Sequence, residues 1–293
     1  MDVPNAPDRD RARGFRIEPA AFYAAKAAAT RLRSLAWAAR SRRRHSPGLR
    51  ILYYHRISDE RDELAVQPRR FRKQMEYLAA GGYRGVDVVE AARLLAGNGN
   101  GDSDGRIVGL SFDDGYRDVA ENALPVLEEQ GFRATVFLAT GVIDGTAKLA
   151  WYDRQPPMLT WDDVARLDGG VFGFEAHTIT HPNLVTLGER EARAEIEESK
   201  AGLEERLGRT VTAFCYPAGV FGERERRLVH EAGFTSATSC DPGANDQATD
   251  PLALRRIQID ARDRLVDFRA KVGGGLDRPL PLRTLVRRRR YGT

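Results

Sequence analysis

This 293-residue chain has few cysteines, a small net charge and no long uncharged apolar run. Its two cysteines, Cys215 and Cys240, have no CxxC spacing, which excludes a disulfide-stapled scaffold and a cysteine-based zinc site. The formal net charge is only +4, so the surface as a whole does not suit a nucleic acid, and no nucleic-acid partner is expected. No uncharged run is long enough for a signal peptide or a membrane-spanning helix. These absences favour a cytoplasmic enzyme or binding protein.

An alanine-rich stretch at 19–39 is apolar except for Lys26, Arg31 and Arg33. It predicts a helix that packs on the domain or lies at a membrane interface. Its candidate apolar contacts are Phe22, Leu32, Leu35 and Trp37.

Basic residues gather in two clusters. One contains Arg40, Arg42, Arg43 and Arg44, and the other contains Arg287, Arg288, Arg289 and Arg290. One interpretation is a pair of solvated tails. The other is peripheral attraction to an anionic membrane at its inner face, because each basic residue near such a surface contributes about 1 kcal/mol. We therefore expect a basic, helical extension at 1–48 and a basic tail at 276–293.

From residue 50 onward, short apolar runs alternate with helical patterns. Strands are expected at 50–55, 106–112, 134–139, 171–176, 211–216, 234–239 and 255–259. Helices are expected at 68–80, 87–96, 117–130, 160–168, 189–207, 222–232 and 264–272. This alternation predicts one α/β domain over 49–275, with a parallel sheet that is open or closed into a barrel. In such folds the functional residues lie at the carboxyl ends of the strands.

Two adjacent carboxylates, Asp113 and Asp114, end one predicted strand in the sequence LSFDDGY. His177 and His181 follow another predicted strand in EAHTITHPNL, and an i, i+4 spacing would put both rings on one side of a helical turn. Alone, the aspartates would be explained equally well by a turn or a helix cap. Two imidazoles and one carboxylate, however, make a tripod for a divalent ion and leave the second carboxylate free as a base.

At this point the motifs SFDDGY, HTITH and FCYPAG resemble those of the polysaccharide deacetylases, the NodB-homology family or carbohydrate esterase family 4. The resemblance runs from about Ile51 to about Phe268, and ILYYHRIS is similar to the family's exopolysaccharide branch. It implies a distorted (β/α) barrel that removes N-acetyl groups from the amino sugars of a polysaccharide, an oligosaccharide or a lipid-linked glycan.

Carried over by position, the resemblance makes Asp114, His177 and His181 the ligands of one divalent metal ion. Zinc is the expected ion, although relatives also use other divalent ions. Asp113 becomes the general base, and an amino-sugar glycan becomes the expected partner.

The family's third motif, Arg-x-Pro-Tyr, is altered, because the aligned stretch 215–218 reads CYPA. The family's tyrosine offers a backbone N–H to the oxyanion, and Ala218 has the same group. The missing arginine orients the base, and Arg255 or Arg256 is a candidate replacement from a later strand. Cys215 is expected to be a small buried residue and not a nucleophile.

The family's last motif, Leu-x-His, is also missing from the C-terminal region. In the exopolysaccharide branch the acid histidine comes from an early strand, which makes His55 the expected general acid. The alternative is that His55 only packs beneath the site. Candidate substrate contacts are Tyr216, Pro217, Trp151, Trp161 and Arg256.

Two other functions stay open. A pseudoenzyme would keep the metal and bind glycan without turnover, as the altered third motif suggests, although a free base and an acid would then have no use. A deformylase or deacylase would use the same site on a lipid-linked or nucleotide-linked sugar.

Overall fold

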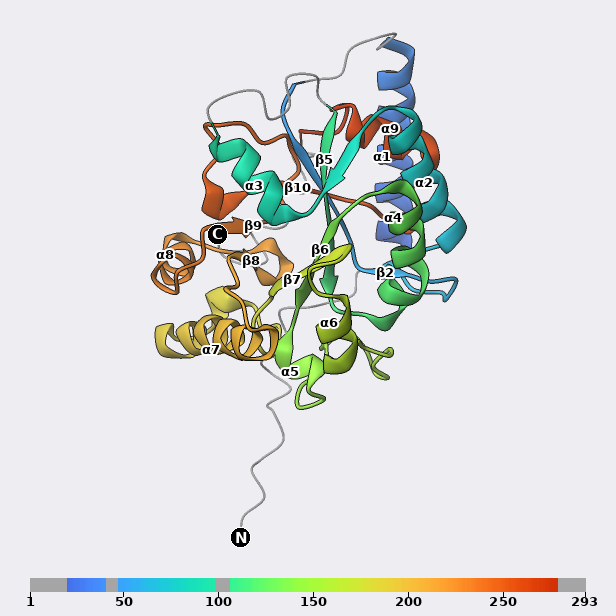
Figure 1. The fold of residues 1–293 in the computed structure, drawn as a ribbon. Coiled ribbons are helices and arrows are strands. Elements are labelled where there is room, and N and C mark those ends of the chain that lie inside the picture. The colour runs from blue at the N-terminus through green and yellow to red at the C-terminus, as the bar shows by residue number, and fades with distance from the viewer. Residues whose placement is uncertain (1–19, 41–46, 98–105, 279–293) are drawn as a thin grey trace.

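The computed structural model describes residues 20–40, 47–97 and 106–278, over which strands and helices alternate (Figure 1). The main sheet contains β1 (Arg50–Tyr54), β4 (Arg84–Val86), β5 (Ile107–Asp114), β6 (Ala134–Leu138), β7 (Phe172–Ala176), β8 (Ala213–Cys215), β9 (Ser236–Thr238) and β10 (Arg256–Gln258). A small second sheet pairs β2 (Arg56–Ile57) with β3 (Ala65–Val66). The α-helices are α1 (Ala20–Arg40), α2 (Pro68–Ala80), α3 (Val88–Ala96), α4 (Leu124–Gln130), α5 (Thr140–Ile143), α6 (Trp161–Leu167), α7 (Glu189–Leu207), α8 (Glu223–Glu231) and α9 (Leu265–Val272).

The strands of the main sheet pair in parallel in the order β10-β1-β5-β6-β7-β8-β9, with β4 also on β5. An isolated parallel bridge joins Thr238 at the end of β9 to Leu254, just ahead of β10. The sheet therefore nearly closes, which confirms the predicted distorted (β/α) barrel. Helices cover its outside, and this explains why the strands read as continuous apolar runs in the sequence.

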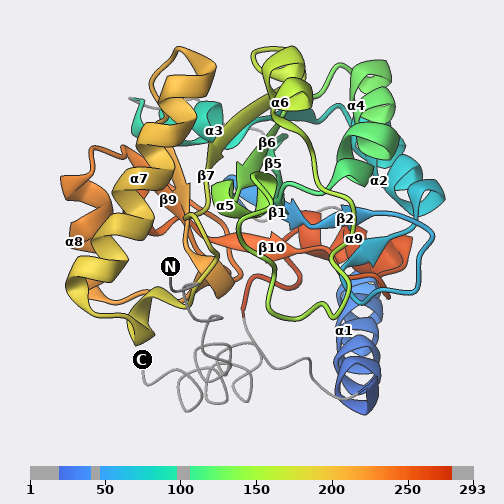
Figure 2. The same cartoon turned by 90° about the horizontal axis from the view of Figure 1, so that it is seen from below.

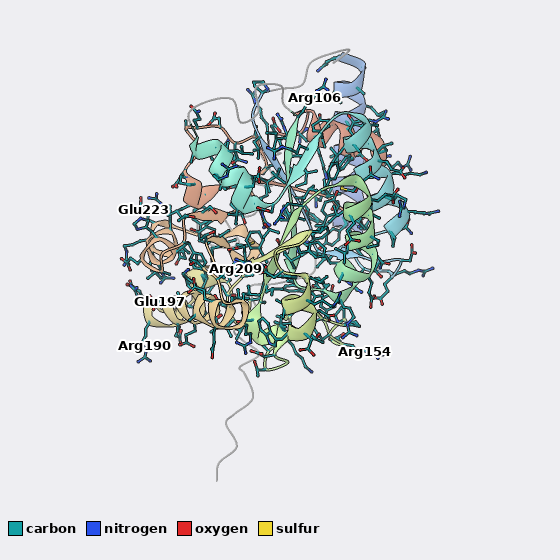
Figure 3. The ribbon with its side chains drawn as sticks, viewed as in Figure 1. Arg106, Arg154, Arg190, Glu197, Arg209 and Glu223 are labelled. Carbon is teal, nitrogen blue, oxygen red and sulfur yellow. The ribbon has the colours of Figure 1, made fainter. Side chains whose placement is uncertain are left out.

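Helices α2, α4 and α9 pack together on one side of the barrel, and α7 and α8 pack on the other (Figures 1 and 2). The outer faces of α7 and α8 are charged, and Arg190, Glu197 and Glu223 lie there at the edge of the molecule (Figure 3). Helix α1, the predicted N-terminal helix, lies against α9. Within the described residues, no helix is long and apolar enough to cross a bilayer.

The predicted element boundaries are confirmed to within a few residues, with one change of type. The segment predicted as a helix at 117–130 begins with a π-helical turn, Val119–Ala123, and becomes α-helical only at Leu124. Pro125 causes this break, because it has no N–H to donate to the preceding turn. Strands β2, β3 and β4 and helix α5 were not predicted, because elements this short carry no visible periodicity.

Several predictions concern residues outside the described ranges. They include most of the predicted extension and tail, the loop after Gly97, and His45. Both arginine clusters also lie there, apart from Arg40, which is exposed at the end of α1. The domain boundaries at 48/49 and 275/276 therefore stay predictions.

The carboxyl ends of the strands meet at one end of the barrel, which Figure 2 faces. His55 follows β1, and Asp113 and Asp114 end β5. His177 follows β7, and Cys215 ends β8. The polar residues singled out from the sequence thus come from four strand ends of the same sheet.

Candidate active site

Three buried side chains converge at this end of the barrel. Asp114 Oδ1 lies 3.5 Å from His177 Nε2 and 3.4 Å from His181 Nε2. The two imidazole rings meet edge to face, with their centroids 4.6 Å apart. The ligand atoms of the three residues lie within 4.8 Å of one another, as three donors around one cation would.

The carboxylate of Asp114 is the strongest sign that a cation belongs in this group. Its side chain is fully buried, and neither oxygen accepts a hydrogen bond that meets ordinary geometry from any residue in the described ranges. Burial, together with the negative charge of Asp113, raises the pKa of Asp114 well above its usual value. A divalent cation would supply the positive charge and the coordination that this carboxylate lacks, so the residues present fit such an ion.

His177 is held in the tautomer that a metal ligand needs. Its Nδ1 lies 2.6 Å from the backbone oxygen of Cys215, which can only accept, so Nδ1 carries the proton. The lone pair of Nε2 then faces Asp114. Burial lowers the pKa of His177 to about 4, and the ring is neutral at physiological pH.

His181 reaches the group through an irregular loop, and the predicted helical turn is wrong. Thr178 and His181 both have left-handed backbones, with φ of 68° and 56°. The Thr178 hydroxyl accepts the N–H of His181 at 3.1 Å, and the carboxylate of Glu195 on α7 accepts the N–H groups of Ile179 and Thr180. Side-chain oxygens therefore accept the backbone N–H groups that would be bonded to backbone oxygens in a helix. Burial, and then His177, lower the pKa of His181 well below its usual value.

Unusual backbone geometry is concentrated at this site. Among the described residues, the non-glycine positions with positive φ are Asp114, Thr178, His181 and Ala218. Each such position costs roughly 1–3 kcal/mol and is kept where the surrounding contacts enforce it, commonly at functional sites. Next to Asp114, Gly115 has a φ of +87°, and a Cβ there would lie 2.6 Å from Leu138. The turn after the two aspartates therefore requires glycine.

Asp113 is bound on both oxygens by the guanidinium of Arg256. The distances are 2.6 Å from Nη1 to Oδ1 and 2.8 Å from Nη2 to Oδ2. Burial acts to raise the pKa of Asp113, but the charge and hydrogen bonds of Arg256 outweigh it, so the pKa is lowered and the carboxylate stays charged. Arg255 is exposed, so Arg256 is the arginine that occupies the orienting position. Arg256 is fully buried beneath Asp113, and the substrate contact predicted for it stays a prediction.

Asp113, His177 and Cys215 form a second cluster of potential ligand atoms. It suits a cation less well, because Arg256 already occupies both oxygens of Asp113. The Cys215 thiol would also have to ionise, and burial raises its pKa well above the usual value. Cys215 is fully buried, as predicted, with its Sγ 3.0 Å from Arg256 Nη2. Its thiol therefore packs against the arginine.

His55 and Ala218 follow the carboxyl ends of β1 and β8. His55 is partly buried at the end of β1, and burial lowers its pKa while the charge of Asp113 acts in the opposite direction. Ala218 lies in a short turn after β8, with a φ of 55°, and is partly exposed. Both positions are compatible with the predicted roles.

The predicted substrate contacts divide into two groups. The ring of Trp151 lies edge-on to His181, with centroids 5.0 Å apart. The Trp161 indole instead donates to Asp144 at 2.6 Å and lies 4.3 Å from the Arg206 guanidinium. Trp151 is thus the tryptophan beside the site.

The third-motif side chains that were expected to touch substrate are both buried. Tyr216 is fully buried, donates its hydroxyl to the backbone oxygen of Leu252 and stacks on Phe221 at 4.2 Å. Pro217 is buried as well. The substrate contacts predicted for these two side chains stay predictions, and neither side chain is exposed.

Some site residues had no signal in the sequence. Glu195 lies far along the chain from the loop it holds, inside an ordinary charged helix pattern. Tyr152 anchors the loop that carries Trp151 by donating to Asp62 at 2.5 Å, and Arg56 binds the same carboxylate at 3.0 Å. The backbone oxygen of Cys215, which orients His177, could not be found from residue types at all.

A family model described as polysaccharide deacetylase matches residues 100–237, across the strand ends that supply both aspartates and both histidines of this group. Over this part of the chain, the sequence is similar to the polysaccharide deacetylases. The chain is 27% identical over 211 residues to "Putative polysaccharide deacetylase YxkH" of Bacillus subtilis strain 168, and the match covers 72% of this chain and 71% of that protein.

Among solved structures, IcaB from Ammonifex degensii has a TM-score of 0.65 and 25% identity, and the match covers 73% of this chain and 93% of that chain. The Streptococcus pyogenes deacetylase PplD, solved in complex with acetate, has the same TM-score and coverage at 24% identity, a likeness of fold. These comparisons confirm the fold predicted from the sequence, and the matched family model agrees with the resemblance carried by the sequence motifs.

Proposed function

We propose that this protein is a metal-dependent deacetylase that hydrolyses the N-acetyl group of an amino sugar in a glycan. The observation that carries the proposal is the pairing of two adjacent carboxylates in opposite environments. Asp114 faces two neutral imidazoles and has no other partner that meets hydrogen-bond geometry in the described ranges, whereas Asp113 is held charged by Arg256. One carboxylate thus suits a cation, and its neighbour suits a base.

Asp114, His177 and His181 would hold the ion, and zinc suits a site with two imidazoles and one carboxylate. A bound divalent ion would lower the pKa of a water molecule and polarise the acetamide carbonyl. Asp113 takes one proton from the attacking water as the C–O bond forms. The fixed guanidinium of Arg256 keeps that carboxylate aimed and charged.

His55 is the proposed acid for the leaving amine. When the C–N bond breaks, the sugar nitrogen must receive a proton, and the products are then acetate and a free amine. Burial favours neutral His55, and the charge of Asp113 favours its protonated form. The backbone N–H of Ala218 is the proposed donor to the oxyanion, where such a group stabilises developing charge.

Acetate release from N-acetylglucosamine oligomers tests this function. We expect the purified protein to release acetate, to stop when a chelator removes its metal and to recover when zinc is returned. Zinc-loaded protein that binds the oligomers and releases nothing would identify a pseudoenzyme. Release of formate only, from N-formylated or lipid-linked sugars, would instead support the deformylase alternative.

Trp151 is proposed to form a wall of the sugar subsite, because its ring lies against His181 and its loop is tied down by Tyr152. Trp151→Ala should raise KM by roughly 2- to 10-fold, the range that an aromatic contact contributes, and leave kcat nearly unchanged. Trp161→Ala is the matched control, since that ring packs on Arg206 and should leave KM unaltered. If both variants had the same KM at unchanged zinc content, Trp151 would not be part of the sugar subsite.

A further inference from the structure

Helix α1 is fixed to the domain through its charged residues. Lys26 Nζ donates to Asp260 at 2.7 Å. Arg31 Nε donates to both carboxylate oxygens of Asp267 at 2.8 Å. Lys26 and Arg31 are therefore directed at the protein, opposite to the arrangement in an ordinary surface helix.

Trp37 holds the other end of the helix. Its indole lies so close to Gly273 and Gly275 that a Cβ at these positions would approach it to 2.3 Å and 2.5 Å. Nearby, Arg33 Nη2 donates to the backbone oxygen of Arg278 at 2.7 Å. Both ends of α1 are thus attached, and its orientation on the domain is well defined.

The opposite side of α1, here named the outer face, contains only apolar side chains up to its last residue. Its exposed members are Ala21, Phe22, Ala24, Ala25, Ala28, Leu32, Leu35, Ala36, Ala38 and Ala39. Phe22 is 41% exposed, Leu32 70% and Leu35 52%, and the other large apolar residue exposed in the described ranges is Val89 at 37%. A contiguous apolar face of this kind marks an interaction surface, whereas the outer face of α7 is charged (Figure 3).

The sequence around the outer face is uniformly basic. No acidic residue occurs between Glu18 and Asp59, a stretch that includes the first arginine cluster. The segment 279–293 contains five arginines and no acidic residue, and it begins immediately after Arg278, which is bonded to α1. In the sequence, basic residues therefore follow directly after the apolar helix and after Arg278, which is bonded to it.

We propose that the outer face of α1 lies on the surface of an anionic lipid bilayer. Apolar side chains at the headgroup boundary, with arginines beside anionic headgroups, are the two attractions that hold an interfacial helix. A second copy of this chain fits less well, because pairing the two outer faces would bring like-charged segments together. The proposal does not depend on the deacetylase function, and its test uses no substrate.

Vesicle sedimentation of the full-length protein tests the proposal. At low salt, the wild type should pellet with vesicles of phosphatidylcholine mixed with phosphatidylglycerol, much less with phosphatidylcholine alone, and be released by salt. Leu32→Glu/Leu35→Glu should partition roughly 100-fold more weakly, because two apolar contacts become charged. Val89→Glu is the matched control, an exposed apolar residue on α3 changed in the same way, and should bind like the wild type.

Three outcomes would overturn the proposal, provided that thermal melts show each variant folded. The wild type could stay in the supernatant with the mixed vesicles, or Leu32→Glu/Leu35→Glu could bind as the wild type does. The wild type could also form a concentration-dependent dimer that the leucine variant lacks, without binding vesicles, and the outer face would then be a protein interface. Replacing Arg287, Arg288, Arg289 and Arg290 with glutamine should weaken vesicle binding more than tenfold, and unchanged binding would contradict the assigned role of the charge.

Discussion

Asp113→Asn should lower kcat for acetate release by roughly 100- to 10,000-fold, the contribution of a positioned general base, and leave the zinc content unchanged. Asparagine keeps the shape of the side chain but cannot take a proton from water. The metal should stay, because Arg256 occupies both oxygens of Asp113, while Asp114 faces the two imidazoles. Steady-state acetate assays and metal analysis on the same preparation measure both quantities.

The fully buried guanidinium of Arg256 complicates this experiment and also supplies its control. Removing one partner of a buried ion pair typically destabilises a protein by about 3–5 kcal/mol, so Asp113→Asn alone should unfold more easily. The double variant Asp113→Asn/Arg256→Met removes both charges and should recover much of the stability while staying inactive. Wild-type kcat in Asp113→Asn would rule out its role as the base, and loss of zinc from this variant would point to the cluster with His177 and Cys215.

Two independent signals in the sequence predicted the fold. Apolar runs of strand length alternate with amphipathic patterns from residue 50 onward, which predicts a parallel sheet. The motifs SFDDGY, HTITH and FCYPAG resemble those of a family with a distorted barrel. The alternation alone could not predict how nearly the sheet closes, because closure depends on the isolated bridge between Thr238 and Leu254, and such a bridge has no periodicity. The π turn ahead of α4 depends on Pro125, whose effect on helix type could not be read from the apolar pattern.

The site was predictable at the level of residue types and not of conformation. Metal-ligating side chains at strand ends pointed to His177, His181 and one of the two aspartates, and the family resemblance selected Asp114. The loop between the histidines was taken for a helical turn, because the spacing fits one. Tertiary hydrogen bonds prevent the helical turn. Glu195 on a distant helix accepts the loop's N–H groups, and Thr178 has a left-handed backbone.

The fate of the third motif shows why side-chain orientation needed the structure. Tyr216 and Pro217 belong to a motif that implied substrate contact, yet both side chains turn inward. Arg256, in contrast, lies in a strand with nothing to distinguish it from Arg255 except the alternation of strand residues between two faces. That alternation decides which of the two arginines reaches Asp113.

Asp114→Asn should abolish zinc binding and turnover together, and it should remove the stabilisation that zinc gives the wild type. A ligand at 100 times its Kd stabilises the folded state by about 2.7 kcal/mol, which corresponds to a rise in Tm of roughly 5–10 °C for a domain of this size. Without metal, the variant should melt no lower than the wild type, because the wild-type chain then buries a carboxyl group whose oxygens accept no hydrogen bond of ordinary geometry in the described ranges. Thermal melts with and without zinc, together with metal analysis, measure these effects.

Asp162→Asn provides the matched control, because it makes the same chemical change at an exposed position on α6. It should keep the zinc content, the zinc-dependent rise in Tm and the acetate release of the wild type. If Asp114→Asn also kept the wild-type zinc content and the full rise in Tm, the cation would have to bind elsewhere. The neutral imidazoles of His177 and His181 and the buried carboxylate between them would then need another explanation, and the proposed catalytic role of Asp113 would lose its basis.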